Sequence, residues 1–526
     1  MTRSILSNWF GLLILAGSTA LLTPVMIHHL GAVDYGVWVL ASSVLDYYGL
    51  LDLGMRSAMF RYVSLFRGGS LREEVDRTFS SALLLVTGAA IVICVLSVGV
   101  ACLLPRFITV QGISPRSFSW LLLLLGFSVA VMFPTRMLAT YISAHNRWDL
   151  YNAAGIANTV TRAIVIVVIL KLGYGILAIA IATVVVAFLS FGQHVAFLFI
   201  ADPRVHVHIR LITFTRIRDL FAFSMRSLLV SLGDYLRFYS DSAVIASVLG
   251  VGLVTPFNVA TRLIECFRSV VVAAGGPVLG AMTELDGAHR QKDLQGLLLR
   301  STRLLALLAI LGGVLLVVDG RPLLHLWVGE ELVSAYSVVA VLAFGYMINL
   351  TQHSALLIII AKGQHGPLGW WSIAEGVANI ALSIIWGLSH GLLGVAMGTI
   401  VPMLVVKLII QPWYAMKAAE MNAWDYLRKG LTRPFLVGVL FFVLAEKIVV
   451  SADLTGPSFI GTVLVQVIIY LACTWTLGLT RTERQWLMEY ARRRLGWPVL
   501  QRTSETSSLE HGSQSSLKNI SCSPRS

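Results

Sequence analysis

The chain has 526 residues, of which 57% are hydrophobic and 13% charged, and its mean hydropathy is +0.79. A soluble domain carries about 25% charged residues, so this composition excludes an ordinary soluble protein and predicts one that crosses a membrane many times. The net charge of +13 arises from basic loops and a basic tail, and it requires no nucleic-acid partner.

Apolar segments follow one another along almost the whole chain. A transmembrane helix needs about 20 mainly apolar residues, and windows of that length predict about fourteen spans. The sequence therefore predicts an all-α integral membrane protein. The predicted spans lie near residues 7–29, 37–66, 79–104, 117–143, 150–170, 175–200, 219–248, 252–283, 297–318, 332–361, 367–389, 391–415, 431–451 and 458–480.

The orientation follows from the positions of Lys and Arg. Basic residues crowd alternate loops, such as those around Arg72, Arg210 and Lys292, whereas the loops between them hold few, such as Lys171. Because basic loops tend to stay in the cytoplasm, we expect the amino and carboxyl termini both to be cytoplasmic. The first span is followed by no small-residue cleavage site, so we expect it to remain as an anchor.

The chain contains an internal repeat. Leu30 and Gly31 recur as Leu249 and Gly250, a spacing of 219 residues, and Ala144 recurs as Ala361 at a spacing of 217. With six spans in each unit, both copies enter the membrane in the same direction. This predicts two parallel-repeat six-helix lobes plus a C-terminal helix pair, and transporters built from such repeats bind their substrate between the lobes.

The repeat also gives the predicted domain organisation. The segment beyond the last span has too few apolar residues to form a core of its own. The predicted units are an N-terminal lobe over residues 1–200, a cytoplasmic linker over 201–218, a C-terminal lobe over 219–415, an appended helix pair over 416–480, and a basic, Ser-rich cytoplasmic tail over 481–526.

Charged residues inside the spans are the candidates for function, because a charge at the bilayer centre costs about 2.5 to 3.5 kcal/mol and normally faces a cavity or a partner. In the second span Asp52 and Arg56 stand four residues apart, a spacing at which side chains meet on a continuous helix. Arg61 lies nearer the interface and is interpreted as an anchor. Arg136, which follows Pro134, is interpreted as a helix-end residue.

Two neighbouring spans have polar faces. In the seventh span the four charged residues from Arg226 to Asp241 fall within roughly 80° of one another on a helix. In the eighth span three polar residues fall within roughly 60°. Glu375 and Asn379 occupy the repeat positions of Asn158 and Arg162, so a polar site in both copies favours a central cavity.

These residues divide into two candidate groups. Arginine suits bidentate contact with phosphate, and an intramembrane acid suits coupling to an H⁺ or Na⁺ gradient. The same charges, nearly balanced in number, can also be interpreted as interhelical salt bridges that fix packing. The substrate-binding candidates are Arg56, Arg162, Arg226, Arg237, Arg262 and Asn258, and the ion-coupling candidates are Asp52, Asp234, Asp241, Glu265 and Glu375.

Other chemistry has little support in the sequence. There is no GxxxxGK[ST] motif, so ATP is not expected to drive the chain directly. We expect no catalytic residue, no metal site and no bound cofactor, and therefore a protein that is not an enzyme.

Two stretches carry a family resemblance. "LGAVDYGVWVLASSVLDYYGLLDLGMRSAMFRYVS", followed by "LFRGGSLREEVDRTF", resembles the polysaccharide flippases of the multidrug/oligosaccharidyl-lipid/polysaccharide exporter superfamily. The second copy, "YSDSAVIASVLGVGLVTPFNVATRLIE", is similar to the seventh and eighth helices of that family, although Thr255 stands where the first copy has Gly36.

The resemblance implies an alternating-access transporter of the bacterial inner membrane. It implies flipping of undecaprenyl-diphosphate-linked oligosaccharide for polysaccharide biosynthesis, with membrane lipids and polysaccharide polymerase machinery as partners. A lipid II flippase and a cation or drug antiporter of the same superfamily remain as alternatives. A membrane glycosyltransferase or polymerase is a further alternative, which the short predicted outer loops disfavour.

Overall fold

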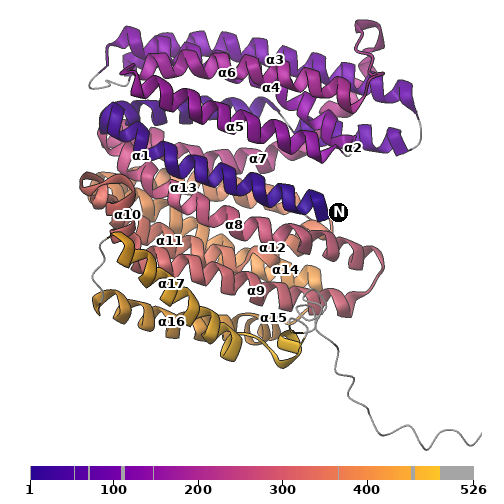
Figure 1. Ribbon diagram of the computed structural model, residues 1–526. Coiled ribbons are helices and arrows are strands. Elements are labelled where there is room, and N and C mark those ends of the chain that lie inside the picture. The colour runs from indigo at the N-terminus through magenta and orange to yellow at the C-terminus, as the bar shows by residue number, and fades with distance from the viewer. Residues whose placement is uncertain are drawn as a thin grey trace, which may run out of the picture.

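The computed structural model describes residues 2–52, 54–68, 71–107, 113–145, 147–364, 366–451, 456–485 and 488. Every regular element within these residues is a helix. The long helices lie side by side, with the amino-terminal half at one edge of the molecule and the carboxyl-terminal helices at the other (Figure 1). The predicted all-α membrane fold is confirmed, and nine of the described helices are long and apolar enough to cross a membrane.

The first half of the chain is a set of long helices. Its first helix turns inside its length, because Gly31 adopts a φ of +81°, and it ends before the 3₁₀ segment that continues the second predicted span. The elements are α1 (Thr2–Asp46), η1 (Tyr47–Asp52), α2 (Met55–Gly68), α3 (Arg72–Phe107), α4 (Pro115–Ala144), α5 (Trp148–Lys171) and α6 (Ile176–Ala201).

The second half follows the same plan. Gly391, with a φ of +61°, again divides one long helix into two spans. The elements are η2 (Ile209–Leu211), α7 (Phe214–Val248), η3 (Val251–Leu253), α8 (Val254–Gly287), α9 (Gln291–Val318), α10 (Gly320–Val328), η4 (Glu330–Ala335), α11 (Tyr336–Thr351), α12 (His353–Ala361), α13 (Gly366–Val405), η5 (Val406–Ile410) and α14 (Gln411–Ala419).

The repeat is visible in the backbone. Gly31 and Gly250, 219 residues apart in the sequence, both have positive φ angles, +81° and +102°. Side chains with a Cβ rarely adopt this region, whereas glycine enters it at little cost. The two copies therefore turn between their first and second spans with the same backbone device. The exact limits of the predicted domains remain a prediction.

The second span is not the continuous helix that its apolar sequence predicts. Residues Tyr47–Asp52 form a 3₁₀ helix, and Gly54 has a φ of +75°. Tyr235 of α7 lies so close to Gly49 that a Cβ there would meet the tyrosine hydroxyl. The prediction of one helix over 37–66 was wrong, because two glycines allow the chain to bend around a side chain from the other half.

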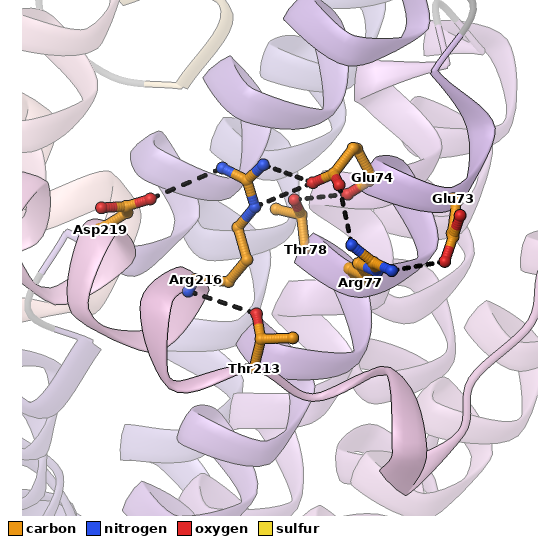
Figure 2. A network of polar contacts seen from close by, with 7 residues as sticks. All are labelled: Glu73, Glu74, Arg77, Thr78, Thr213, Arg216 and Asp219. Atoms are coloured by element: carbon orange, nitrogen blue, oxygen red, sulfur yellow. Dashed lines mark hydrogen bonds and ion pairs between the residues drawn. The ribbon is translucent and has the colours of Figure 1, made fainter.

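Helix α7 joins the two halves. Most of its length packs against α13, while its first turn also contacts α2 and α3. At that end Arg216 donates to Glu74 of α3, through Nε at 3.0 Å and also through Nη2, and its guanidinium carbon lies 4.6 Å from the centre of the Phe66 ring. Figure 2 shows Arg216 reaching from α7 to Glu74, which also accepts a hydrogen bond from Arg77.

A final pair of helices packs on α9. The elements are α15 (Ala423–Tyr426), η6 (Leu427–Leu431), α16 (Thr432–Ser451), α17 (Gly456–Cys473) and η7 (Thr474–Gly478). Gly430 and Gly438 allow this hairpin to approach α9 closely, because a Cβ at either position would contact Thr302 or Ile310. In Figure 1, α16 and α17 lie at the carboxyl-terminal edge of the molecule.

Candidate substrate and ion sites

The two halves touch where α1 meets the start of α8. Tyr35 donates a hydrogen bond to Asn258 over 3.0 Å, and the Thr255 hydroxyl donates to the carbonyl oxygen of Ala32. A Cβ on Gly36 would lie 2.9 Å from both the Thr255 hydroxyl and the Val251 carbonyl oxygen. These contacts, here called the Gly36–Thr255 contact, close the space between the halves at this end of the bundle.

Deeper between the halves lies a group of charged side chains. Asp46, at the end of α1, is within electrostatic range of Arg136 from α4, Arg162 from α5, and Arg262 and Glu265 from α8. Asp46, Arg136 and Arg162 are exposed, although helices from both halves surround them. Because charged groups within a bilayer normally face a water-filled cavity or one another, their exposure favours an open space between the halves. We call these five residues the central charge cluster.

Within the cluster, Arg262 has one direct partner. Its Nη1 lies 3.0 Å from the Glu265 carboxylate, and the side chains are 39% and 51% exposed. Arg262 also lies beside Tyr35 of the Gly36–Thr255 contact. Asn258, a candidate substrate ligand, has its amide oxygen engaged by Tyr35. Tyr35 therefore contacts residues of both groups: Arg262 of the central charge cluster and Asn258 beside the Gly36–Thr255 contact.

The Asp52–Arg56 pair survives the bend in the second span. Arg56 Nε lies 2.8 Å from Asp52 Oδ2, and the side chains are 47% and 15% exposed. Tyr235 of α7 is within electrostatic range of this pair and also of Asp46 and Arg136. The pair therefore lies beside the central charge cluster, with Arg56 free to reach solvent on one side.

A second polar group is buried between α7 and α13. Asp241 Oδ2 accepts a hydrogen bond from Thr399 over 3.0 Å, and Ser240 donates to the Asn379 amide oxygen over 3.3 Å. Asp241 Oδ1 and Asn379 Nδ2 have no hydrogen-bond partner among the described side chains. Glu375 is buried one turn earlier on α13. We call Asp241, Asn379, Thr399 and Ser240 the buried carboxylate site.

The sequence analysis found some of these residues and missed others. Asp46 and Arg136 were not among the candidates: Arg136 was interpreted as a helix-end residue, and no local pattern distinguished Asp46 from the other acids of the spans. Thr399 was missed because a threonine in an apolar helix carries no signal. The side chains of Arg226, Asp234, Arg237 and Arg61 lie outside the described residues, so the predicted stripe on α7 is tested only at Asp241.

The described part of the chain contains no group of three or more His, Cys, Asp or Glu side chains placed to bind a metal ion. A single buried carboxylate with neighbouring hydroxyl and amide oxygens is instead the kind of oxygen-rich setting that suits a proton or a hard monovalent cation.

Several solved structures share this architecture. The chain resembles the lipid II flippase MurJ in an inward closed conformation, with a TM-score of 0.69, 15% identity, and coverage of 94% of this chain and 100% of that one. It also resembles an inward-facing MATE multidrug transporter, with a TM-score of 0.66, 13% identity, and coverage of 80% and 99%. At these identities the likeness establishes the fold, which is that of an all-helical, multi-pass membrane protein.

Sequence comparison gives the family. The model described as "Polysaccharide biosynthesis protein" matches residues 25–337, and the chain belongs to that family. A protein of Shigella flexneri named "Putative O-antigen transporter" is 21% identical over 399 residues, which cover 73% of this chain and 90% of that protein. The predicted family resemblance is thereby confirmed.

Proposed function

We propose that this protein flips undecaprenyl-diphosphate-linked oligosaccharide across the bacterial inner membrane by alternating access, for polysaccharide biosynthesis. The family and the name of the Shigella flexneri relative support an oligosaccharide cargo. The transporter fold supports movement across a bilayer rather than catalysis. In this proposal the membrane is the bacterial plasma membrane, both termini are cytoplasmic, and a polysaccharide polymerase receives the product.

The central charge cluster is the observation that carries the proposal. Three arginines, Arg136, Arg162 and Arg262, face an accessible space against two acids, Asp46 and Glu265. An excess of arginine suits a diphosphate, because the guanidinium binds phosphate oxygens in pairs. A cationic drug would instead be repelled by this cluster, which makes the antiporter alternative the weaker one.

The buried carboxylate site supports ion coupling. Among the described residues, Asp241 Oδ1 accepts no hydrogen bond within normal geometry, and an ionised carboxylate in such a buried position is costly. Binding of H⁺ or Na⁺ would remove that cost, and α7 would carry the effect toward the first half, which its other end contacts. This assigns Asp241 to coupling, with Glu375 beside it, and leaves Asp52 and Glu265 as members of surface-accessible pairs.

The proposal is tested in cells that lack the gene. Loss of the protein should cause lipid-linked oligosaccharide to accumulate on the cytoplasmic face, and the wild-type gene should reverse it. Arg162→Gln, in the central charge cluster, should fail to reverse it at normal membrane abundance, whereas Arg116→Gln, an exposed residue at the start of α4, should succeed. Accumulation of lipid II instead would identify the lipid II flippase alternative, and accumulation of neither would refute the proposal.

A further inference from the structure

One buried acid lies far from both candidate sites. Asp319 follows the last residue of α9, and its side chain is next to Gln466 in the middle of α17. Gln466 donates through Nε2 to Asp319 Oδ1 over 3.2 Å. The two residues are 2% and 0% exposed. This contact joins the second half of the chain to the appended hairpin, across 147 residues of sequence.

The hydrogen bonding of this pair is incomplete. Asp319 Oδ2 and Gln466 Oε1 are both buried acceptors with no donor among the described residues. Gln466 Nε2 also points toward the Ala445 carbonyl oxygen at 3.5 Å, so the amide has no donor left to offer. Two buried acceptors without a donor are unfavourable, and a buried ionised carboxylate without a cation is far more so.

Within the part of the chain that the structure describes, no positive charge pairs with Asp319. Its side chain has one polar partner there, Gln466. The neighbouring elements carry Arg321 on α10 and Glu446 and Lys447 on α16, and all three are exposed. Their neighbour Ala445 is the residue of α16 that faces inward. Asp319 is therefore buried without a counter-ion among the described residues.

One proton on Asp319 would neutralise the buried charge and would supply the missing hydrogen-bond donor. A protonated carboxyl can donate its O–H to the amide oxygen while one of its oxygens accepts the amide N–H, so a carboxylic acid and a primary amide satisfy each other. We propose that Asp319 is a proton-binding site and that the neutral acid–amide pair of Asp319 and Gln466 clasps the appended hairpin to the second half.

The clasp has a counterpart near the middle of α9. Arg303 and Glu483 form a buried ion pair at 2.5 Å, and Arg303 also donates to the Lys429 carbonyl oxygen. These anchors are 16 residues apart on α9, about 24 Å at helical rise. The hairpin is thus held by charges at one end and by a protonated acid at the other, so only one end responds to loss of a proton.

The direction of the pH effect follows from linkage. The folded chain binds the Asp319 proton more tightly than the unfolded chain does, so stability is full at low pH and is lost as the pH rises. Burial raises the pKa of Asp319 to about 6, so the purified protein should have an unfolding temperature that falls as the pH rises from about 4 to about 6. Asp319→Asn keeps a neutral amide in place of the acid and should flatten this dependence, whereas Glu331→Gln, at an exposed acid of η4, should leave it unchanged.

Infrared spectroscopy tests the proton directly. The wild-type protein at a pH of about 5, below the raised pKa of Asp319 and above the ordinary pKa of an aspartate, should show the C=O stretch of a protonated carboxyl group that Asp319→Asn removes. Gln466→Leu should shift this band to higher frequency, because the carbonyl loses its hydrogen-bond donor, and this result identifies the band even if Asp319→Asn folds poorly. An ionised Asp319 at a pH of about 5, where the raised pKa predicts a protonated carboxyl group, would overturn the proposal. So would stabilisation of the wild type by Na⁺ at constant pH that Asp319→Asn abolishes, since a metal cation would then occupy the site.

Discussion

Gly36 and Thr255 occupy equivalent positions of the two repeats, 219 residues apart, and they touch each other between the halves. The first copy supplies a residue with no side chain and the second supplies a hydroxyl that bonds the opposite backbone at Ala32. The departure from the repeat at this position is therefore what lets the halves approach so closely.

A side chain at position 36 should weaken this contact. In Gly36→Ala the new Cβ would lie 2.9 Å from the Val251 carbonyl oxygen, a backbone atom that cannot rotate away. We expect the closed end of the bundle to open more often, which a cysteine introduced at Val251 in a cysteine-free background would report as faster labelling by a maleimide. Gly88→Ala, where no atom lies within 4 Å, is the control. Unchanged labelling in Gly36→Ala would show that the contact does not govern access.

The Asp52–Arg56 pair should contribute to transport more than to stability. Because Arg56 is 47% exposed, the ion pair is expected to stabilise the fold by less than about 1 kcal/mol. The double variant Asp52→Asn, Arg56→Gln should reach the membrane at normal abundance but transport poorly, since the pair lies beside the central charge cluster. Both are measured in the same cells, by immunoblot and by lipid-linked oligosaccharide accumulation. Normal transport would assign the pair to packing.

Replacement of Asp241 should uncouple transport from its ion. Asp241→Asn keeps the shape of the side chain and the hydrogen bond from Thr399 but removes the charge that attracts a cation. In proteoliposomes the variant should lose its response to imposed Na⁺ and H⁺ gradients while it still binds substrate. Glu446→Gln, an exposed residue of α16, should respond like the wild type. A gradient response that persists in Asp241→Asn would exclude this carboxylate as the coupling group.

Asp202, which follows α6, should make the protein sensitive to acid. Burial alone would raise the pKa of this carboxyl, but hydrogen bonds from Arg72 and Tyr141 outweigh burial, and the pKa lies below its ordinary value. A lowered pKa contributes stability above the unfolded value of about 3.9, and that stability is lost as the pH falls below it.

We therefore expect Asp202→Asn to lower the free energy of unfolding by about 2 kcal/mol at neutral pH and to reduce the further loss at acidic pH. Thermal unfolding of the detergent-solubilised protein at several pH values measures both effects. Asp149→Asn, which alters an exposed pair with Arg147, serves as the comparison. Equal pH profiles for Asp202→Asn and the wild type would contradict this account.

The sequence predicts the helices well because a membrane span depends on the apolar composition of about 20 consecutive residues. The repeat can also be predicted from local signals. Gly31 and Gly250 both adopt positive φ angles, which favour glycine, so the same residue appears at the same position of each copy. The bend at residues 47–54 could not be predicted, because it depends on Tyr235 from another helix. Long-range polar pairs could not be predicted for the same reason. Asp241, for example, accepts a hydrogen bond from Thr399, which is 158 residues away in the sequence.

Helix α7 is attached to α3 by contacts that do not depend on an unbroken chain between the two halves. Arg216 binds Glu74 without help from the connecting segment, and that segment is itself held along α3, where the backbone N–H groups of His206 and His208 meet Asp76 and Ser80. A break in the peptide backbone between His206 and the next residue would keep both of these amide N–H groups and leave every one of these contacts in place. The protein should therefore assemble from two separately synthesised polypeptides, residues 1–206 and 207–526, as a split transporter whose fragments find each other in the membrane.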